Sequence, residues 1–102
     1  MQLNVIVKKP NEAQTEQVIE SGLKPLQNLV GGMIEMPDMN STVSMVCNEE
    51  GKILQLKSNL RLPYDTIMGT IVFIGYDDCG ASRSLTEKEK IEVNAFIEEH
   101  KI

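Results

Sequence analysis

Aromatic residues are scarce in this sequence of 102 residues, which has two Phe, two Tyr and no Trp. Proteins that bind single-stranded nucleic acid stack its bases on aromatic rings, and this chain offers few such rings. Its core has to be built from Ile, Val, Leu and Met, and six Met are present. We therefore expect an aliphatic core and no direct binding of nucleic acid.

Cysteine is also rare, since Cys47 and Cys79 are the only two. They form no Cys-x-x-Cys pair that could hold a metal or exchange disulfides. The opening segment MQLNVIVKKP lacks the charged head and apolar run of a signal peptide, and the chain has no run of about 18 apolar residues. We expect a cytoplasmic protein with no metal, no cofactor and no membrane contact.

Basic residues are fewer than acidic ones: 10 Lys and Arg against 15 Asp and Glu give a net charge of −5. Such a balance opposes nonspecific binding to phosphate backbones and anionic membranes. It suits either simple solubility or a basic partner. With 41% hydrophobic and 25% charged residues, the composition is that of one globular domain, which we expect over residues 1–102.

Apolar patterns predict the strands. Residues 3–9 alternate between two faces, which indicates a first strand. Residues 42–48 alternate as well and are followed by a short turn segment and then residues 52–56, which predicts a hairpin with Gly51 at positive φ. Residues 69–75 form the most apolar stretch, so we expect a central strand that is buried on both faces.

Helix signals occur at three places. Residues 11–22 contain few apolar residues and are either a short helix or an extended connector. Pro25 is well placed in the first turn of a short helix that ends at Gly31. The last segment is strongly helical, since Thr86 and Glu89 match the capping-box pattern. Spacings of three and four residues among Ile91, Val93, Ala95, Phe96 and Ile97 predict an apolar stripe on that helix.

Together these elements predict an α+β fold with a small, mostly antiparallel sheet of about five strands and the C-terminal helix packed on one face. A partly closed barrel is the alternative. Residues 57–65 are polar and contain a proline, so we expect them to cross the surface as a loop. An exposed strand edge in so small a sheet is compatible with a homodimer.

Five short segments follow one another along the chain in a distinctive order. They are LVGGMIE at residues 29–35, VCNEEGK at 46–52, NLRL at 59–62, IMGTIVFIG at 67–75 and SRSLTEKE at 82–89. This order resembles an uncharacterised domain family encoded by bacteriophages, plasmids and their bacterial hosts. The likeness covers most of the chain after Pro25, and residues 1–24 match least. It implies a fold and a genomic neighbourhood but no catalytic residues.

A small protein of this type without enzyme motifs is similar to accessory or anti-defence factors. We therefore expect a non-enzymatic binding protein, an inhibitor that sequesters a small anionic or nucleotide-like ligand or blocks a host protein. One alternative is an acidic protein that occupies a basic nucleic-acid-binding groove on a partner. Another is a hydrolase that uses Cys79 or the two aspartates Asp77 and Asp78.

The polar segments on either side of the strand predicted at residues 69–75 are the expected working surface, because loops on a rigid scaffold often carry binding. Arg83 and the start of the last helix can hold an anion, although the same segment is equally compatible with a solvated loop that merely caps the helix. Arg61 would complete a site if it met Arg83. The predicted ligand-binding residues are Asn59, Arg61, Tyr64, Asp78, Ser82, Arg83 and Ser84.

Overall fold

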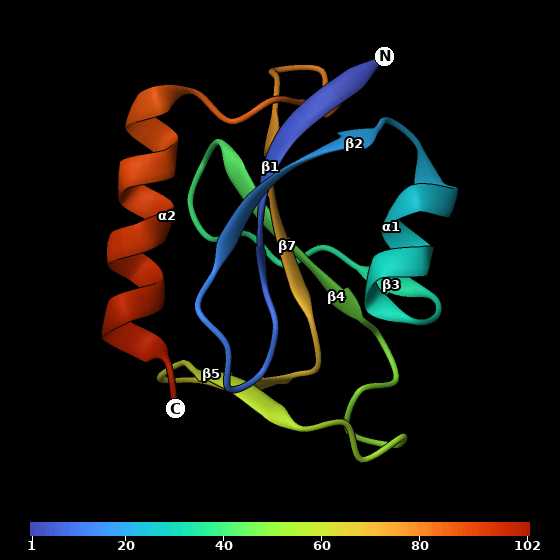
Figure 1. Cartoon of the computed structure of the whole chain (residues 1–102), viewed down its shortest axis with the longest axis vertical. Coiled ribbons are helices and arrows are strands. Elements are labelled where there is room, and N and C mark those ends of the chain that lie inside the picture. The colour runs from blue at the N-terminus through green and yellow to red at the C-terminus, as the bar shows by residue number, and fades with distance from the viewer.

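The computed structural model describes residues 1–102, and its two helices lie on opposite sides of a set of strands (Figure 1). In chain order the elements are β1 (Gln2–Lys8), β2 (Thr15–Glu20), α1 (Leu23–Val30), β3 (Ile34–Glu35), β4 (Val43–Asn48), β5 (Ser58–Arg61), β6 (Thr66–Met68), β7 (Ile71–Tyr76), β8 (Ser82–Arg83) and α2 (Glu87–His100).

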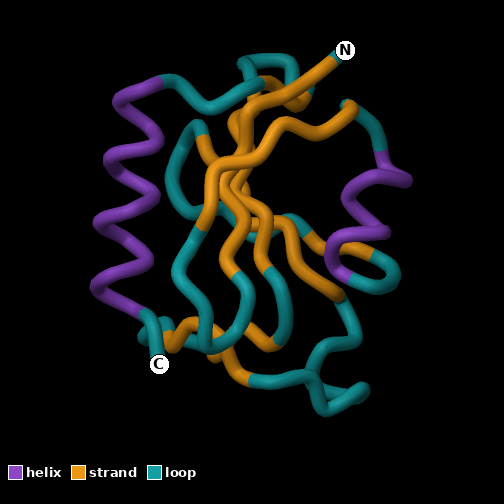
Figure 2. The backbone as a smooth tube through the Cα atoms, in the orientation of Figure 1, coloured by secondary structure: helices purple, strands orange, loops and turns teal.

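The strands form one main sheet and one small hairpin. The main sheet has the order β2-β1-β7-β4-β3, and β8 pairs with the end of β7. The hairpin consists of β5 and β6. All of the pairings are antiparallel, and Figure 2 shows the strands gathered between the two helices. The predicted α+β fold with a mostly antiparallel sheet and a C-terminal helix is confirmed.

The central strand β7 divides the core into two apolar layers. Ile71 and Phe73 belong to a cluster of 12 buried residues on the α2 side. Val72 and Ile74 belong to a cluster of eight on the α1 side. Successive side chains of a strand point to opposite faces, so a strand between two layers has to be apolar at every position. This explains the continuous apolar run, and the prediction of burial on both faces is confirmed.

Helix α2 begins as the capping pattern predicted. The Thr86 side chain accepts from the backbone N–H of Glu89, and the Glu89 side chain accepts from the backbone N–H of Thr86. Val93 and Ile97 are fully buried against the sheet. Ile91 is 71% exposed, so the predicted stripe was too wide, because it included a position that faces away from the core.

Helix α1 is short and covers part of the other face. Pro25 lies in its first turn, and the helix ends at Gly31, which has a φ of 80°. Both features were predicted. Neither helix combines the length and apolar character needed to cross a membrane.

Residues 15–20 form strand β2 and not the helix that was one of the two predicted alternatives. All six pair with β1, from Gln2 opposite Glu20 to Val7 opposite Thr15. A strand at the edge of a sheet buries little of its surface, so it needs few apolar residues. The weak pattern at Val18 and Ile19 therefore concealed a strand.

The predicted hairpin between residues 42–48 and 52–56 was wrong. Strand β4 is flanked by β3 and β7, so neither of its edges is free for a further strand. Residues 49–56 form a series of turns, in which Ile53 is 79% exposed. Gly51 does not have positive φ; the positive value in this segment belongs to Gln55, at 56°.

The predicted surface loop at residues 57–65 was also wrong. Residues 58–61 form β5, and Leu60 and Leu62 are buried in the layer under α2, at 0% and 6% exposed. Alternate residues of this segment face the core, while Ser58 and Arg61 give it a polar appearance. Only the tip of the hairpin, around Pro63 and Tyr64, is an exposed turn.

Candidate functional site

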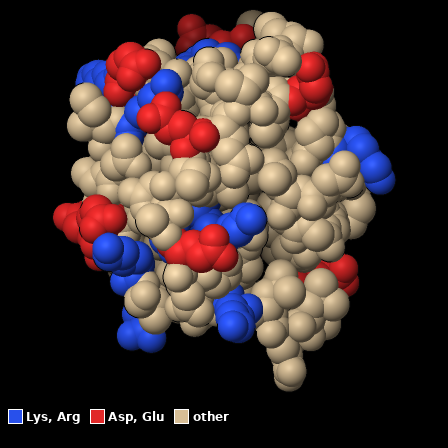
Figure 3. Space-filling view, viewed as in Figure 1, with Lys and Arg blue, Asp and Glu red and all other residues tan.

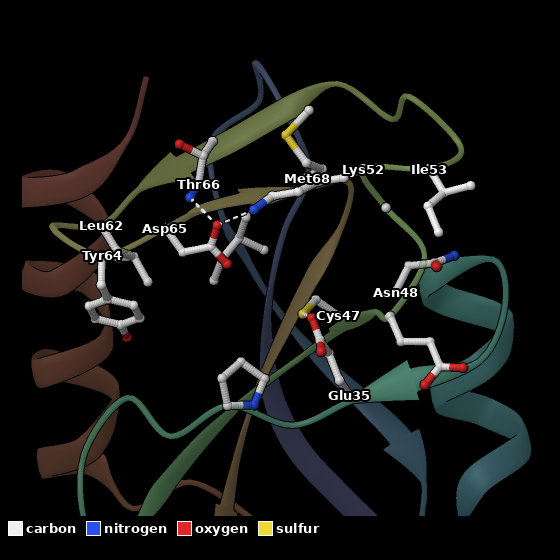
Figure 4. A pocket seen from close by; sticks show the side chains of 14 residues that line it. Glu35, Cys47, Asn48, Lys52, Ile53, Leu62, Tyr64, Asp65, Thr66 and Met68 are labelled. Atoms are coloured by element: carbon white, nitrogen blue, oxygen red, sulfur yellow. Dashed lines mark hydrogen bonds and ion pairs between the residues drawn. The ribbon is translucent and has the colours of Figure 1, made fainter.

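A cleft of about 230 Å³ opens between β4 and the hairpin of β5 and β6. We call it the β4 cleft; β3 and the turns of residues 49–56 complete its walls. In Figure 4, charged and apolar side chains from these elements face the same space. Apolar walls with a few placed polar groups are typical of ligand sites. The β4 cleft is therefore the candidate functional site.

The turns of residues 49–56 are fixed by Asn48 at the end of β4. Its side-chain oxygen accepts from the backbone N–H of Glu50 at 2.8 Å, and its Nδ2 donates to the carbonyl oxygen of Val30 at 3.2 Å. Gly51 lies against β6, where an added Cβ would come within 3.1 Å of the Cβ and carbonyl oxygen of Met68. Glycine at this position therefore lets the turn approach β6 and narrows the cleft.

Lys52 and Asp65 form an ion pair across the mouth of the cleft (Figure 4). Asp65 also accepts from the backbone N–H of Thr66 at 2.8 Å. The hydrogen bond from Lys52 is the main reason that the pKa of Asp65 lies below its ordinary value. Both side chains are well exposed, at 64% and 45%, so the pair contributes little to stability. It can open without a large cost to the fold.

Glu35 and Cys47 lie together on the opposite wall (Figure 4). The Cys47 thiol donates to Glu35 Oε1 at 3.7 Å. Burial, followed by the negative charge of Glu35, raises the pKa of Cys47 to about 12. A thiolate is the reactive form of cysteine, so this thiol is protonated and weakly nucleophilic near neutral pH.

The charges around the cleft are unequal. Glu35, Glu49 and Asp65 line it on the acidic side, while Lys52 is the one basic residue of the lining. Glu35 takes part in none of the ion pairs of the structure. This arrangement favours a positively charged group.

Among the seven predicted site residues, Tyr64 lines the cleft. It is 74% exposed. Asn59, in contrast, is buried: its Nδ2 donates to the carbonyl oxygens of Lys8 and Gly69 at 2.8 Å each, and its Oδ1 accepts from Lys8 Nζ at 3.2 Å. These contacts tie β5 to β1, so Asn59 has no free group for a ligand.

The structure does not bring Arg61 and Arg83 together. Arg83 donates to both carboxylate oxygens of Glu89, at 2.7 and 2.9 Å, in the first turn of α2. Arg61 lies at the other end of this helix, where the adjacent Leu60 forms a β-bridge with Lys101. The 14 residues of α2 separate the two ends by roughly 20 Å at about 1.5 Å per residue.

The other three predicted residues belong to the chain segment between β7 and α2. Asp78 is exposed in a tight turn that Asp77 holds through two backbone N–H groups, at 2.9 Å each. Ser82 is part of β8, which pairs with β7. The Ser84 hydroxyl accepts from the backbone N–H of Asn4 at 2.8 Å. Ser82 and Ser84 therefore help to close the sheet.

The charged residues of the β4 cleft were missed. Glu35, Lys52 and Asp65 come from three segments that only the fold brings together. One signal was available, since Leu60 and Leu62 alternate just before a Pro-Tyr-Asp turn, which is typical of a hairpin with Asp65 at its tip. Nothing in the sequence marks Lys52 as the partner of Asp65.

Comparison with known proteins identifies a family. No curated protein and no solved structure matches the chain. The model of a family described as a domain of unknown function, DUF3846, matches residues 1–99. The match includes the first 24 residues, which had resembled the family least. The chain therefore belongs to the DUF3846 family.

Proposed function

We propose that this protein works by binding, and that the β4 cleft receives a lysine or arginine side chain of a partner protein. The observation that carries the proposal is the Glu35 carboxylate, which lines the cleft but belongs to no ion pair. Asp65 supplies a second carboxylate, which it shares with Lys52. A cation between these groups gains charge-assisted hydrogen bonds in a partly desolvated space.

The size of the cleft supports a side chain rather than a whole nucleotide. Its volume is about 230 Å³, whereas pockets for small molecules begin at about 300 Å³. Ile53 and Met68 line the same space and offer apolar contact to the aliphatic stem of lysine or arginine. An arginine fits these features best, because its planar head can donate two parallel hydrogen bonds to one carboxylate.

The nature of the partner is suggested by the family likeness. We propose that the protein belongs to a phage or plasmid, as the resemblance of its sequence implies, that its partner is a host protein and that it acts in the host cytoplasm. An anti-defence role, in which the partner is blocked, is the biological function that we propose. The raised pKa of Cys47 supports binding over covalent chemistry at this site.

An NMR titration tests the cleft directly. The probe is the capped tripeptide acetyl-Leu-Arg-Leu-amide, added to ¹⁵N-labelled protein. We expect amide shifts to concentrate on β3, β4 and the β5–β6 hairpin. Glu35→Gln removes one charge without changing the shape of the wall and should weaken binding by about tenfold, the value of one charge-assisted hydrogen bond.

Two controls make the titration decisive. A peptide with citrulline in place of arginine keeps the shape but loses the charge, so it should bind the wild-type protein at least as weakly as the arginine peptide binds Glu35→Gln. Glu99→Gln removes an exposed acid that does not line the cleft and should leave the affinity unchanged. Equal affinities for wild type and Glu35→Gln would refute the proposed site.

A second candidate function retains the predicted small anionic ligand. Arg61 is exposed, belongs to no ion pair and lines a hollow of about 230 Å³ with His100 and Lys101. Three nitrogen-bearing side chains around one hollow favour an anion, although Glu99 also lines it. Inorganic phosphate and pyrophosphate are suitable probes, because a hollow of this volume is too small for a whole nucleotide. Binding that Arg61→Ser abolishes would support this site in place of the β4 cleft.

A further inference from the structure

Strand β2 forms a free edge of the main sheet. It stands at the end of the strand order and pairs only with β1. The opposite end of the order is the two-residue strand β3. A free edge presents unpaired backbone N–H and C=O groups. β2 is therefore the longer of the two edges at which a further strand can add.

The register shows which backbone groups of β2 are unpaired. The backbone N–H of Ser21 donates to the carbonyl oxygen of Met1 at 2.8 Å, which makes these two residues a hydrogen-bonded pair. Such pairs alternate along an antiparallel ladder, so Ile19 and Gln17 also bond to β1. The backbone N–H and C=O groups of the alternate residues point away from β1. These residues are Glu16, Val18 and Glu20.

The side chains of β2 give the two sides of the edge different chemistry. Glu16, Val18 and Glu20 are exposed on the α2 side. Glu16 pairs there with Lys90 of α2 at 3.0 Å and Glu20 with the ammonium group of Met1 at 3.4 Å, and the two acidic side chains stay 64% and 62% exposed. Ile19 points to the α1 side and lines a groove of about 210 Å³ between the sheet edge and α1. The α2 side of the strand therefore carries two carboxylates, and the α1 side offers an apolar contact at Ile19.

The apolar groove lies where α1 is too short to cover the sheet. Leu3, Ile74 and Leu26 form its base, and Leu23, which is 53% exposed, stands at its rim. In Figure 3, charged side chains of both signs are interspersed over α2, and fewer lie on the surface between the strands and α1. An added strand beside β2 would direct every second side chain toward this groove.

We propose that an extended segment of a partner protein adds to β2 as a further strand, with alternating basic and apolar side chains. Its basic side chains lie opposite Glu16 and Glu20, and its apolar side chains enter the groove beside Ile19. A second copy of this chain fits less well, because acidic side chains on an edge oppose pairing with an identical edge. The groove also reaches Ile34 of β3, but it shares no lining residue with the β4 cleft. Ile34 packs in the layer under α1, whereas Cys47 and Leu62 of the cleft belong to the layer under α2.

The test uses a capped hexapeptide of alternating Lys and Leu, titrated by calorimetry. The control peptide has the same composition but three Lys followed by three Leu, so that as a strand it carries Lys and Leu on both of its faces. It should bind at least about tenfold more weakly than the alternating peptide. Val18→Pro removes an outward N–H and leaves the bonds to β1 intact. This variant should keep its circular dichroism spectrum and lose about tenfold or more in affinity.

Because the β4 cleft is itself proposed to receive lysine, the two peptides are also titrated into Glu35→Gln. In that background the preference for the alternating peptide, and its loss in Val18→Pro, should both persist, which separates this surface from the cleft. Equal affinities for the two peptides, or for wild type and Val18→Pro, would overturn the proposal. A dimer that sedimentation detects in the wild type and not in Val18→Pro would also overturn it, in favour of a second copy. If Val18→Pro does not fold, an alternating peptide with N-methylated backbone replaces it, and undiminished binding of that peptide would count against strand addition.

Discussion

The pair of Arg83 and Glu89 should make the stability of this fold depend on pH, and Glu89→Gln removes that dependence. Glu89 is 6% exposed. It accepts from both terminal nitrogens of Arg83, at 2.7 and 2.9 Å, and from the backbone N–H of Thr86 at 2.9 Å. The glutamine side chain has nearly the same shape but no charge, so the substitution tests the ionised carboxylate and little else.

The pKa of Glu89 sets the size of the effect. Hydrogen bonds from Arg83 are the main cause of its fall from an ordinary 4.5 to about 2. Because one pKa unit corresponds to about 1.4 kcal/mol, the ionised carboxylate stabilises the folded state by about 3 kcal/mol at neutral pH. The folded-state pKa is lowered, so this stabilisation is complete above pH 4.5 and disappears as the pH falls toward 2.

Urea unfolding of both proteins at several pH values measures this difference. At pH 7 we expect Glu89→Gln to be less stable by about 2 to 3 kcal/mol, and the gap should narrow steadily below pH 4.5. Glu99→Gln, an exposed control in no ion pair, should follow the wild type throughout. A gap at pH 7 that persists unchanged to pH 3 would refute the reasoning, because it would mean that shape rather than charge is responsible.

Two further predictions follow from burial. Cys79 is exposed, whereas Cys47 is 2% exposed and has a pKa of about 12. Ellman's reagent should therefore label one thiol in the native protein and two in urea. Rapid labelling of both thiols in the native protein would contradict the burial of Cys47. Asn59→Ala leaves the carbonyl oxygens of Lys8 and Gly69 without their donor. We therefore expect the free energy of unfolding, measured in urea, to fall by about 2 to 4 kcal/mol. A fall below about 0.5 kcal/mol would show that water replaces the amide.

The parts of the fold that the sequence predicted are those with two independent signals. The strand predicted at residues 69–75, which the structure has at Ile71–Tyr76, has an apolar run between two glycines. Helix α2 has both the Thr86–Glu89 capping box and an apolar stripe. Each signal reflects a local requirement, either burial of both faces of a strand or satisfaction of the first N–H groups of a helix. Local requirements can be read from neighbouring residues.

The parts that failed depend on which strand edges are already occupied. Residues 52–56 have the apolar content of a strand, but β3 and β7 occupy both edges of β4, so Ile53 is left in solvent. Residues 15–20 have little apolar content, yet β1 offers them a free edge. Which strands pair with each other depends on the whole chain, so it cannot be predicted from a short stretch of neighbouring residues.

The candidate site was predicted least well, for a related reason. Arg83 and Ser84 were predicted because they lie in a polar segment. The fold uses Arg83 to hold the first turn of α2 through Glu89 and uses the Ser84 hydroxyl to accept from Asn4 of β1. Asn59 was also predicted, and this polar residue proved to be an internal tie. A hydrogen-bonding side chain is equally suited to structure and to function, and only its partners decide which role it has. Tyr64 was predicted as part of a surface loop at residues 57–65, and it lies in the one part of that segment that is an exposed turn.

The division of the core by β7 has a consequence for how this protein tolerates change. The cluster of 12 residues under α2 and the cluster of eight under α1 share no member. Effects of substitutions at distant, unconnected positions add, whereas those at touching positions interact. Leu26→Ala in one layer and Ile97→Val in the other should therefore cost together the sum of their separate costs, so that each side of the sheet can vary independently of the other.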